Sequence, residues 1–379
     1  MEQLFITNIE IEKVRHIKDI SIPLSKERIK HLILTGKNGS GKTSVTEALA
    51  GCINNIFTDK SFDLKQDGNG LKIQLNNATG NIIALKQNYH YILAYYKADR
   101  IFQAEQPKHV EKVQLKDNYA LTDFPRNEFV KYLLDLKMTE ALARNSNKTE
   151  KADGIKEWFQ NLENLLKNVF ADKTVKLEFD EETFEFHILQ QGKEPFDFNT
   201  LSSGYQAVLD IVLDIIMRMQ NQTRQSFDFN LPGIVLIDEI ETHLHLELQR
   251  NIMSLLTGIF PNIQFIVTSH SPFILNSIEN VVIYDLEKNL LVEEGLDNVP
   301  YDGIVEGYFG ADKLSVTLQD KFEEYKSLVN KESLSADEMS RIAELEFYLD
   351  EIPDYLAISI SAEYQKLKLE YMHREDEDG

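Results

Sequence analysis

Residues 36–43 read GKNGSGKT and fill every fixed position of the phosphate-loop pattern G-x-x-x-x-G-K-S/T. The glycines allow a tight turn in which successive backbone N–H groups point at a phosphate, and the helix predicted to follow adds its positive N-terminal end. Lys42 would neutralise charge between the β- and γ-phosphates, and the Thr43 hydroxyl would bind Mg²⁺. The loop therefore predicts binding of ATP with Mg²⁺. The residues expected to contact the nucleotide are Gly36, Asn38, Gly39, Ser40, Gly41, Lys42, Thr43 and Ser44.

A second segment, residues 233–240, reads GIVLIDEI and supplies two neighbouring carboxylates. Asp238 and Glu239 follow a predicted buried strand, at the end where open α/β sheets bind ligands. Asp238 would hold Mg²⁺ together with Thr43, and Glu239 would orient the attacking water or accept its proton. By itself such a pair is most often a solvated strand end. The phosphate loop upstream favours the catalytic interpretation.

Three further pieces narrow the class of ATPase. They are LSSGYQ at residues 201–206, ETHLH at residues 241–245, and His270 after the apolar run QFIVTS. With the phosphate loop and the carboxylate strand they resemble, in the family's order, the motifs of ABC ATPases: phosphate loop, signature, carboxylate strand, D-loop and switch histidine. The resemblance covers roughly residues 4–290. It implies an α/β P-loop ATPase head, with a mixed N-terminal sheet and a parallel core sheet flanked by helices.

The resemblance also implies an assembly of two or more chains. Ser202, Ser203 and Gly204 would form a second anion cradle at a helix N-terminus, one without a lysine of its own. In ABC ATPases this cradle closes on the γ-phosphate bound by another protomer, which implies a homodimer or a higher even-numbered oligomer around two ATP molecules. His270 would contact the γ-phosphate, the alternative being a histidine satisfied at the edge of the core.

Two further assignments rest on position alone. The family's glutamine that completes the Mg²⁺ shell corresponds best to Gln103, in the segment YYKADRIFQ. Lys97 and Arg100 in the same segment could serve the phosphates or a substrate, or belong to a solvated loop. Arg15, in the first predicted hairpin, matches an arginine that relatives place near the nucleotide.

Hydrophobic periodicity predicts the elements that position these residues. Strand patterns precede the phosphate loop, helical patterns fill the middle of the chain, and a βαβ unit carries the carboxylate pair. The polar stretch 143–154 separates two helical patterns and predicts a mobile linker. The predicted strands are 4–14, 18–24, 31–35, 233–237 and 264–268, with strand patterns over 71–87, turning at Gly80, and over 89–96, and with hairpins over 175–199. The predicted helices are 129–142, 155–170, 205–219 and 249–260.

These patterns divide the chain into four parts. Residues 1–98 form the N-terminal half of the ATPase lobe with the phosphate loop, and residues 99–172 form a helical insertion. Residues 173–310 form the C-terminal half with the other motifs. Residues 311–379 form a helical C-terminal appendage that ends in an acidic tail. Within it, Ser335 and Glu338 have the spacing of a capping box at a helix start.

Composition limits the partners and the compartment. The formal charge of −22 disfavours nucleic-acid binding by the isolated chain, because phosphate neutralisation by basic residues supplies most non-specific affinity. No run is long and apolar enough to span a bilayer, and the N-terminus does not resemble a signal peptide. The single cysteine, Cys52, excludes an internal disulfide, and we expect a cytoplasmic protein without a membrane partner.

The surroundings of the motifs favour one branch of the family. The opening IEKVRHIKDISIPL resembles the N-terminal hairpin of the SMC, RecF and OLD-like branch, and no sustained heptad predicts a coiled-coil arm. The segments DEIETHLHLELQ and SHSPFIL, with the helical appendage, resemble stand-alone ATPases of bacterial anti-phage systems: the Septu, retron-associated and PARIS ATPases. That resemblance implies a regulatory ATPase that controls a partner effector nuclease. The alternatives are a DNA-repair or recombination ATPase that binds DNA across its dimer, and a nucleotide-gated scaffold that does not hydrolyse ATP.

Overall fold

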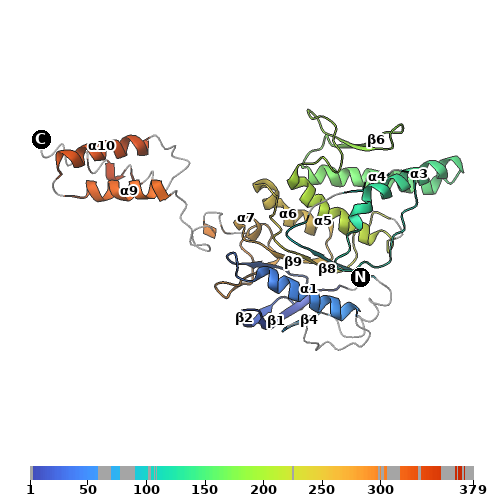
Figure 1. Ribbon diagram of the computed structural model, residues 1–379, viewed down its shortest axis with the longest axis horizontal. Helices are drawn as coiled ribbons and strands as arrows, with labels where there is room; N and C mark the ends of the chain where they lie inside the picture. The colour runs from blue at the N-terminus through green and yellow to red at the C-terminus, as the bar shows by residue number, and fades with distance from the viewer. Residues whose placement is uncertain are drawn as a thin grey trace. The chain divides into compact units, whose positions relative to one another are not determined.

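The computed structural model of the 379-residue chain contains two compact units, Met1–Val299 and Pro300–Gly379, which are described separately (Figure 1). None of the helices in the described ranges is long and apolar enough to cross a membrane. The structure describes residues 3–58, 70–76, 90–100, 104–105, 107, 109–223, 226–297, 299, 303–304, 316–331, 334–350, 363–364, 366–368 and 371.

A three-stranded antiparallel sheet begins the first unit, in the order β2-β1-β4. Its strands are β1 (Ile6–Val14), β2 (Ile17–Pro23) and β4 (Leu71–Leu75). Apolar residues alternate along β1, so one face is buried, and Ile9 lies opposite Ile73 of β4. The predicted N-terminal hairpin is confirmed by the pairing of β1 with β2.

A six-stranded sheet carries the motifs, in the order β11-β10-β3-β9-β8-β5. All neighbours in it are parallel except β11 with β10, and the five parallel strands are buried along their whole length. Because parallel strands point the same way, the ends of β3, β9, β8 and β5 meet at one edge. The strands are β3 (His31–Thr35), β5 (Ile92–Tyr96), β8 (Gly233–Ile237), β9 (Ile263–Thr268), β10 (Val281–Asp285) and β11 (Leu290–Val292).

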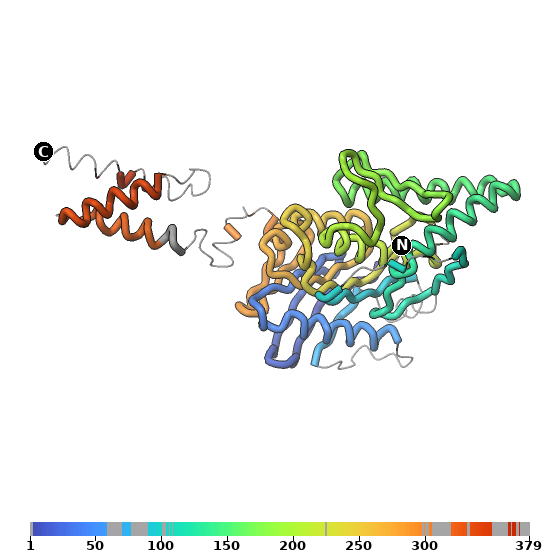
Figure 2. The backbone as a smooth tube through the Cα atoms, turned by 45° about the horizontal axis from the view of Figure 1, so that its top comes forward, coloured from blue at the N-terminus to red at the C-terminus, as the bar shows by residue number. Residues whose placement is uncertain are grey.

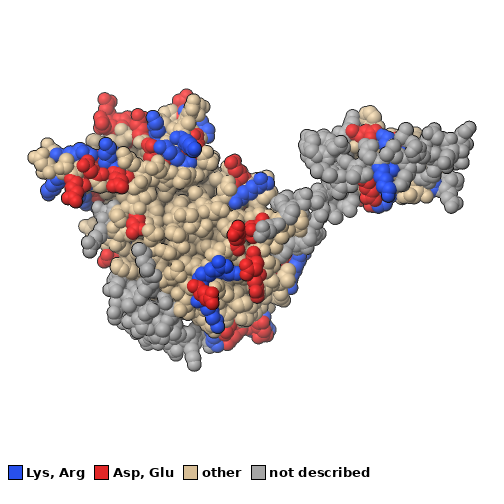
Figure 3. All heavy atoms as spheres, turned by 180° about the vertical axis from the view of Figure 1, so that it is seen from behind, with Lys and Arg blue, Asp and Glu red and all other residues tan. Residues whose placement is uncertain are grey.

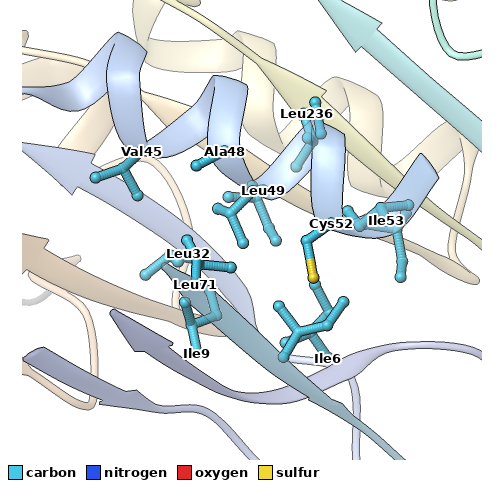
Figure 4. Packing of buried hydrophobic residues seen from close by; sticks show 14 of the residues in the cluster. Ile6, Ile9, Leu32, Val45, Ala48, Leu49, Cys52, Ile53, Leu71 and Leu236 are labelled. Atoms are coloured by element: carbon cyan, nitrogen blue, oxygen red, sulfur yellow. The ribbon is translucent and has the colours of Figure 1, made fainter. Parts of the chain in front are cut away.

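The helix that follows the phosphate loop, α1 (Lys42–Thr58), joins the two sheets into one core. Its apolar side chains point toward Ile9, Leu32 and Leu71, as the close view in Figure 4 shows (Figure 4). The buried thiol of Cys52 belongs to this core. The other face of the six-stranded sheet is covered by α5 (Ser203–Met219) and α6 (Leu246–Ile259), as Figure 1 shows. The sheet is therefore a middle layer between helices, and the predicted α/β fold is confirmed.

Between β5 and α5 the chain forms η1 (Pro125–Glu128) and two helices packed side by side, α3 (Phe129–Asn145) and α4 (Thr149–Val169) (Figure 2). The predicted mobile linker over 143–154 is wrong, because both helices extend into it and leave a three-residue turn. The Lys148 amide donates to the Ala143 carbonyl at 2.8 Å, and Arg144 pairs with Asp153 at 3.2 Å, so a backbone hydrogen bond and an ion pair close a tight helical hairpin here.

The first unit also contains a short hairpin and a short helix. The predicted hairpin after α4 is confirmed as β6 (Lys176–Phe179) paired antiparallel with β7 (Phe186–Leu189). A short helix, α7 (Pro272–Leu275), follows β9.

The second unit has a core of its own, formed between α9 (Val316–Val329) and α10 (Ala336–Asp350). The predicted capping box is confirmed, since the Ser335 amide donates to Glu338 Oε2 at 2.9 Å and the Glu338 amide donates to Ser335 Oγ at 3.3 Å. Its buried residues include Phe322, Tyr325, Val329, Ile342, Leu345 and Leu349.

Candidate active site

The phosphate loop connects the end of β3 to the start of α1, as a P-loop does. Gly36, Gly39 and Gly41 all have positive φ, at 131°, 85° and 99°. A Cβ atom on Gly41 would lie 2.5 Å from Ile17 Cδ1, so the approach of β2 to the loop requires glycine at this position. The loop thus keeps the tight turn that its sequence predicts.

Lys42 lies across this turn. Its Nζ donates to the carbonyl oxygens of Gly36 at 2.7 Å and Lys37 at 3.2 Å, and the side chain is almost entirely buried. Thr43 is exposed beside it in the first turn of α1, whereas Ser44 is buried. The Ser40 hydroxyl is buried without a hydrogen-bond partner among the described residues. A cation, hydroxyls and a helix N-terminus therefore surround a loop of the shape that cradles phosphates.

The carboxylate pair follows β8 in a turn tied to β9. The Thr268 hydroxyl donates to Asp238 Oδ1 at 2.6 Å and accepts the Glu239 amide at 2.7 Å. Glu239 has φ of 46°, in the left-handed region, and its side chain is partly exposed. Asp238 and Thr43 offer a carboxylate and a hydroxyl, the hard oxygen donors that Mg²⁺ prefers, so this donor set fits the predicted metal.

Arg100 holds the same turn from β5. Its guanidinium donates to the carbonyl oxygens of Asp238 at 3.0 Å, Glu239 at 3.3 Å and Ile240 at 3.1 Å, and only 7% of the residue is exposed. A solvated loop was one interpretation of this segment, and it is wrong for Arg100. Lys97 is exposed, in agreement with that interpretation. Gln103 lies outside the described residues.

His270 follows β9 and contacts Glu241 of the D-loop. Its Nδ1 lies 2.9 Å from Glu241 Oε1, which also accepts the His270 amide at 2.7 Å. The hydrogen bond to Glu241 raises the pKa of the imidazole; nearby Lys42 opposes the rise and Glu239 adds to it. His270, Lys42 and Glu239 are therefore close enough to interact electrostatically within one chain.

The signature segment begins α5. Ser202 and Ser203 are exposed, and Ser202 has the extended backbone of an N-cap; its side chain makes no capping hydrogen bond within the described residues. Gly204 is buried, and a Cβ atom there would lie 3.1 Å from Leu248 Cδ1 and 3.3 Å from the His243 carbonyl oxygen. The signature therefore packs directly on the D-loop of its own chain.

The D-loop also carries His243 and His245. Among the described residues, no group of three or more metal-binding side chains forms around them. His245 caps α6, since its Nδ1 accepts the Leu248 amide at 3.5 Å, and its ring lies 6.1 Å from that of Tyr205. His243 is exposed, with φ of 68°.

The tip of the first hairpin lies against the phosphate-loop region. Arg15 has φ of 53°, its side chain is 72% exposed, and its guanidinium lies 3.9 Å from a carboxylate oxygen of Glu47 on α1. His16, which sequence reasoning did not single out, lies with Nε2 at 3.2 Å from the Ser40 carbonyl oxygen. The hairpin thus brings two side chains beside the loop.

A buried ionic network fixes the signature helix, and sequence reasoning missed it. Asp214 Oδ2 accepts Arg218 Nε at 2.7 Å and the Tyr96 hydroxyl at 2.8 Å, and Arg126 pairs with Asp210. Burial raises the pKa of Asp210 to about 6, against the effect of Arg126. The spacing of Asp210, Asp214 and Arg218, four residues apart in an otherwise apolar helix, is the signal that could have revealed it.

Comparison with known proteins identifies the family. A family model described as "AAA domain, putative AbiEii toxin, Type IV TA system" matches residues 32–276, more than half of the chain and all five motifs. The chain belongs to this AAA-domain family. Its resemblance to the ATPases of anti-phage systems is also confirmed, for the Septu and retron systems, by similarity to a Septu protein and a retron ATPase.

The chain is 25% identical to the Septu protein PtuA of Bacillus mycoides (strain KBAB4) over 393 residues, which cover 96% of the chain and 53% of that protein. It is 33% identical to the "Retron Ec83 probable ATPase" of Escherichia coli over 151 residues, which cover 38% of the chain and 27% of that protein. The chain thus spans about half the length, or less, of these relatives.

Among solved structures, the SmcHead bound to the C-winged helix domain of ScpA has a TM-score of 0.41 at 14% identity, covering 78% of this chain and 100% of that one. The structure of cbiO1 from Clostridium perfringens has a TM-score of 0.39 at 14% identity, covering 78% and 89%.

Proposed function

We propose that the chain is an ABC-type ATPase that works as a head-to-tail dimer and regulates an effector in a bacterial anti-phage defence complex. The observation that carries the ATPase part is that Lys42, the pair Asp238 and Glu239, and His270 follow β3, β8 and β9, which are neighbouring parallel strands of the six-stranded sheet. These four residue types at the ends of such strands match the needs of phosphoryl transfer to water.

Within this proposal each group has one task. Lys42 and the N–H groups of the loop bind the β- and γ-phosphates, and His270 contacts the γ-phosphate. Thr43 and Asp238 would hold Mg²⁺, which supplies positive charge to the phosphate oxygens when bound. Glu239 orients the attacking water and accepts its proton. Arg100 and Thr268 support this chemistry by holding the turn on which Glu239 lies.

The dimer follows from the second anion cradle. Ser202 and Ser203 lie exposed at the N-terminus of a 17-residue helix, where N–H groups and the helix dipole attract a negative charge. The γ-phosphate held by a second chain supplies that charge, and two cradles then bury two ATP molecules. Because Gly204 packs on the D-loop, closure of the cradle would be transmitted to the turn that carries Glu239.

The regulatory role is supported by the relatives. The relatives are named for the Septu and retron systems, and the chain aligns with Septu PtuA over almost its whole length. We infer a separate effector nuclease as partner. A DNA-binding role is disfavoured by the charge of −22, and on the face in Figure 3 the basic side chains of the first unit lie beside acidic ones (Figure 3).

Two variants test the ATPase dimer. Lys42→Ala should abolish ATP binding, because it removes the cation that the triphosphate needs. Glu239→Gln should bind ATP but not hydrolyse it, and should therefore trap the closed dimer. Equilibrium binding of a fluorescent ATP analogue and light scattering with Mg-ATP measure the two effects. Identical sizes for the two variants under Mg-ATP would contradict the clamp.

The partner is tested by co-expression with the products of neighbouring genes. Nuclease activity should depend on the state of the ATPase, so Lys42→Ala and Glu239→Gln should change it in opposite directions. A nuclease that ignores both variants would restrict the proposal to ATP hydrolysis alone.

A further inference from the structure

Glu241 is a buried carboxylate in the D-loop that the proposed chemistry does not use. Only 7% of the residue is exposed, and Oε1 accepts two hydrogen bonds from His270, one from the backbone amide at 2.7 Å and one from ring Nδ1 at 2.9 Å. Oε2 is buried and has no hydrogen-bond partner within the described ranges. A buried carboxylate is costly unless it is paired, so His270 is the group that compensates it.

This contact constrains the ring in two ways. Because the same carboxylate oxygen accepts both the backbone amide and Nδ1, the ring is fixed relative to the end of β9. A carboxylate at Nδ1 also requires a proton there, which leaves Nε2 as the nitrogen that faces away from Glu241. The side chain is 54% exposed, so the ring can meet a ligand.

We propose that Glu241 is a positioning residue that holds His270 as an imidazolium whose Nε2–H is directed at the γ-phosphate. The inference rests on the proposed function, because it assigns the ring's target to the nucleotide. It differs from the role of Glu239, which acts on water, since Glu241 acts only through His270.

The charged groups around the ring support a cation at this place. From the turn after β8, Glu241 and Glu239 favour the charged ring, and from α1, Lys42 opposes it. The hydrogen bond to Glu241 has the largest effect and leaves the pKa of His270 raised. Burial acts to raise the pKa of Glu241, yet the hydrogen bonds from His270 outweigh it and leave that pKa lowered. Both shifts favour the ion pair.

The experiment uses the full chain with histidine labelled at Cε1 by ¹³C, with the His270 signal assigned by its loss in His270→Asn. Wild type, Glu241→Gln and Glu241→Ala are titrated without nucleotide and again with Mg-ATP. Glu279→Gln is the matched control, because it removes an exposed carboxylate from the segment after β9, outside the groups that act on His270. ATP turnover is followed across the same pH range.

The Gln variant keeps an acceptor oxygen but loses the charge, so the pKa of His270 should fall, whereas Glu279→Gln should not change it. Turnover should fall by about 10- to 100-fold in kcat with little change in KM, by analogy with the range found when carboxylates that orient metal-bound histidines are removed. Since the imidazolium is the working form, activity is lost as pH rises through its pKa, and this alkaline limb should move to lower pH in Glu241→Gln. Mg-ATP should shift the His270 signal strongly in wild type and weakly in Glu241→Ala.

An unchanged His270 titration in Glu241→Gln would overturn the inference whatever the turnover. A lowered pKa with unchanged kcat and an unchanged pH profile would also overturn it, and would leave the proposed ATPase intact. If wild type did not hydrolyse ATP, the proposed hydrolysis would be contradicted, but the role of Glu241 would not yet be tested. The Mg-ATP shift of the His270 signal would then decide the inference. A strong shift in wild type that weakens in Glu241→Ala would support the positioning role, and equal shifts or no shift would overturn it.

Discussion

Thr268 bonds directly to Asp238 through its hydroxyl, across two neighbouring parallel strands. The same oxygen accepts the amide of Glu239, so one hydroxyl fixes both the carboxylate expected to hold Mg²⁺ and the backbone that carries the carboxylate proposed to act on water. Residue 268 is buried, which means that no water can replace the hydroxyl without rearrangement.

Thr268→Val should therefore impair catalysis more than folding. Valine keeps the shape of threonine but leaves the Glu239 amide without an acceptor, at a cost of about 1–3 kcal/mol in stability. We expect ATP turnover to fall by about tenfold or more while ATP affinity changes less, because Lys42 is untouched. Denaturant unfolding and steady-state kinetics measure the two effects.

Thr268→Ser is the matched variant, because serine keeps the hydroxyl and loses only a methyl group. It should retain most of the turnover. Equal losses in the serine and valine variants would mean that packing of the methyl group, and not the hydroxyl, matters at this position.

Gly41→Ala should distort the phosphate loop. Its added Cβ would clash with Ile17 and would sit on a backbone of φ 99°, so both space and conformation oppose it. We expect loss of ATP binding and a decrease in the free energy of unfolding of about 1–3 kcal/mol, measured by chemical denaturation.

The control for this change is another glycine-to-alanine substitution. Gly154 lies inside α4, where an added Cβ meets no atom within 4 Å, so Gly154→Ala should stabilise the chain by roughly 0.5–1 kcal/mol and leave ATP binding unchanged. If both substitutions affected ATP binding alike, the loop geometry would not explain the effect of Gly41→Ala.

The main outline of fold and motifs could be predicted because each motif is local in sequence. The phosphate loop needs a strand, a few glycines and a helix in succession, and the structure has β3 and α1 on either side of Gly36 and Gly41. Strand polarity then placed Asp238 and His270 at the same edge, since both follow strands of one parallel sheet.

The supporting contacts could not be predicted in the same way, because they join residues far apart in the chain. Arg100 bonds to carbonyl oxygens about 140 positions later, and a pattern of residue types carries no sign of a backbone acceptor. Glu241 was visible as the third carboxylate of DEIE, yet its contact with His270 depends on the turn after β8. The error at 143–154 arose because polar residues form a tight helical turn there instead of a linker.

His31, on the strand that leads into the phosphate loop, should make the chain sensitive to acid. Its Nδ1 accepts the Phe265 amide at 3.1 Å, so the ring must stay neutral, and burial lowers its pKa to about 4. In the unfolded chain His31 takes up a proton near pH 6.5, whereas in the folded chain it stays neutral down to about pH 4. The stability that the neutral ring contributes is therefore fully present above pH 6.5 and is lost as pH falls toward the pKa of the folded state. Between pH 7.5 and 5 this amounts to about 2 kcal/mol.

The measurement is the free energy of unfolding at pH 7.5 and pH 5. His31→Gln should be less stable than wild type at pH 7.5 but should lose less stability on acidification. His109→Gln, which removes an exposed imidazole, is the control and should follow wild type. If His31→Gln and wild type lost the same stability between the two pH values, the buried ring would not be the acid-sensitive group.

The strongest prediction of the head-to-tail dimer concerns mixtures of two inactive variants. Lys42→Ala should disable the phosphate loop, and Ser202→Arg should block the cradle with a bulky cation, so each variant alone should lack turnover. In a mixed dimer one site combines both defects, whereas the other combines an intact loop with an intact cradle. Random mixing makes about half of the dimers mixed, each with one good site, so turnover should recover to about one quarter of the wild-type value.

The mixture should be made by denaturing and refolding the two chains together, and a mixture of Lys42→Ala with Glu239→Gln serves as the control. In the proposed dimer the phosphate loop and Glu239 of one site come from the same chain. Each site of this mixed dimer therefore has one defect, either in the loop or in the glutamate, and no turnover should return. Failure of the Ser202 mixture to recover turnover, as in the control, would mean that the cradle serves the phosphate loop of its own chain.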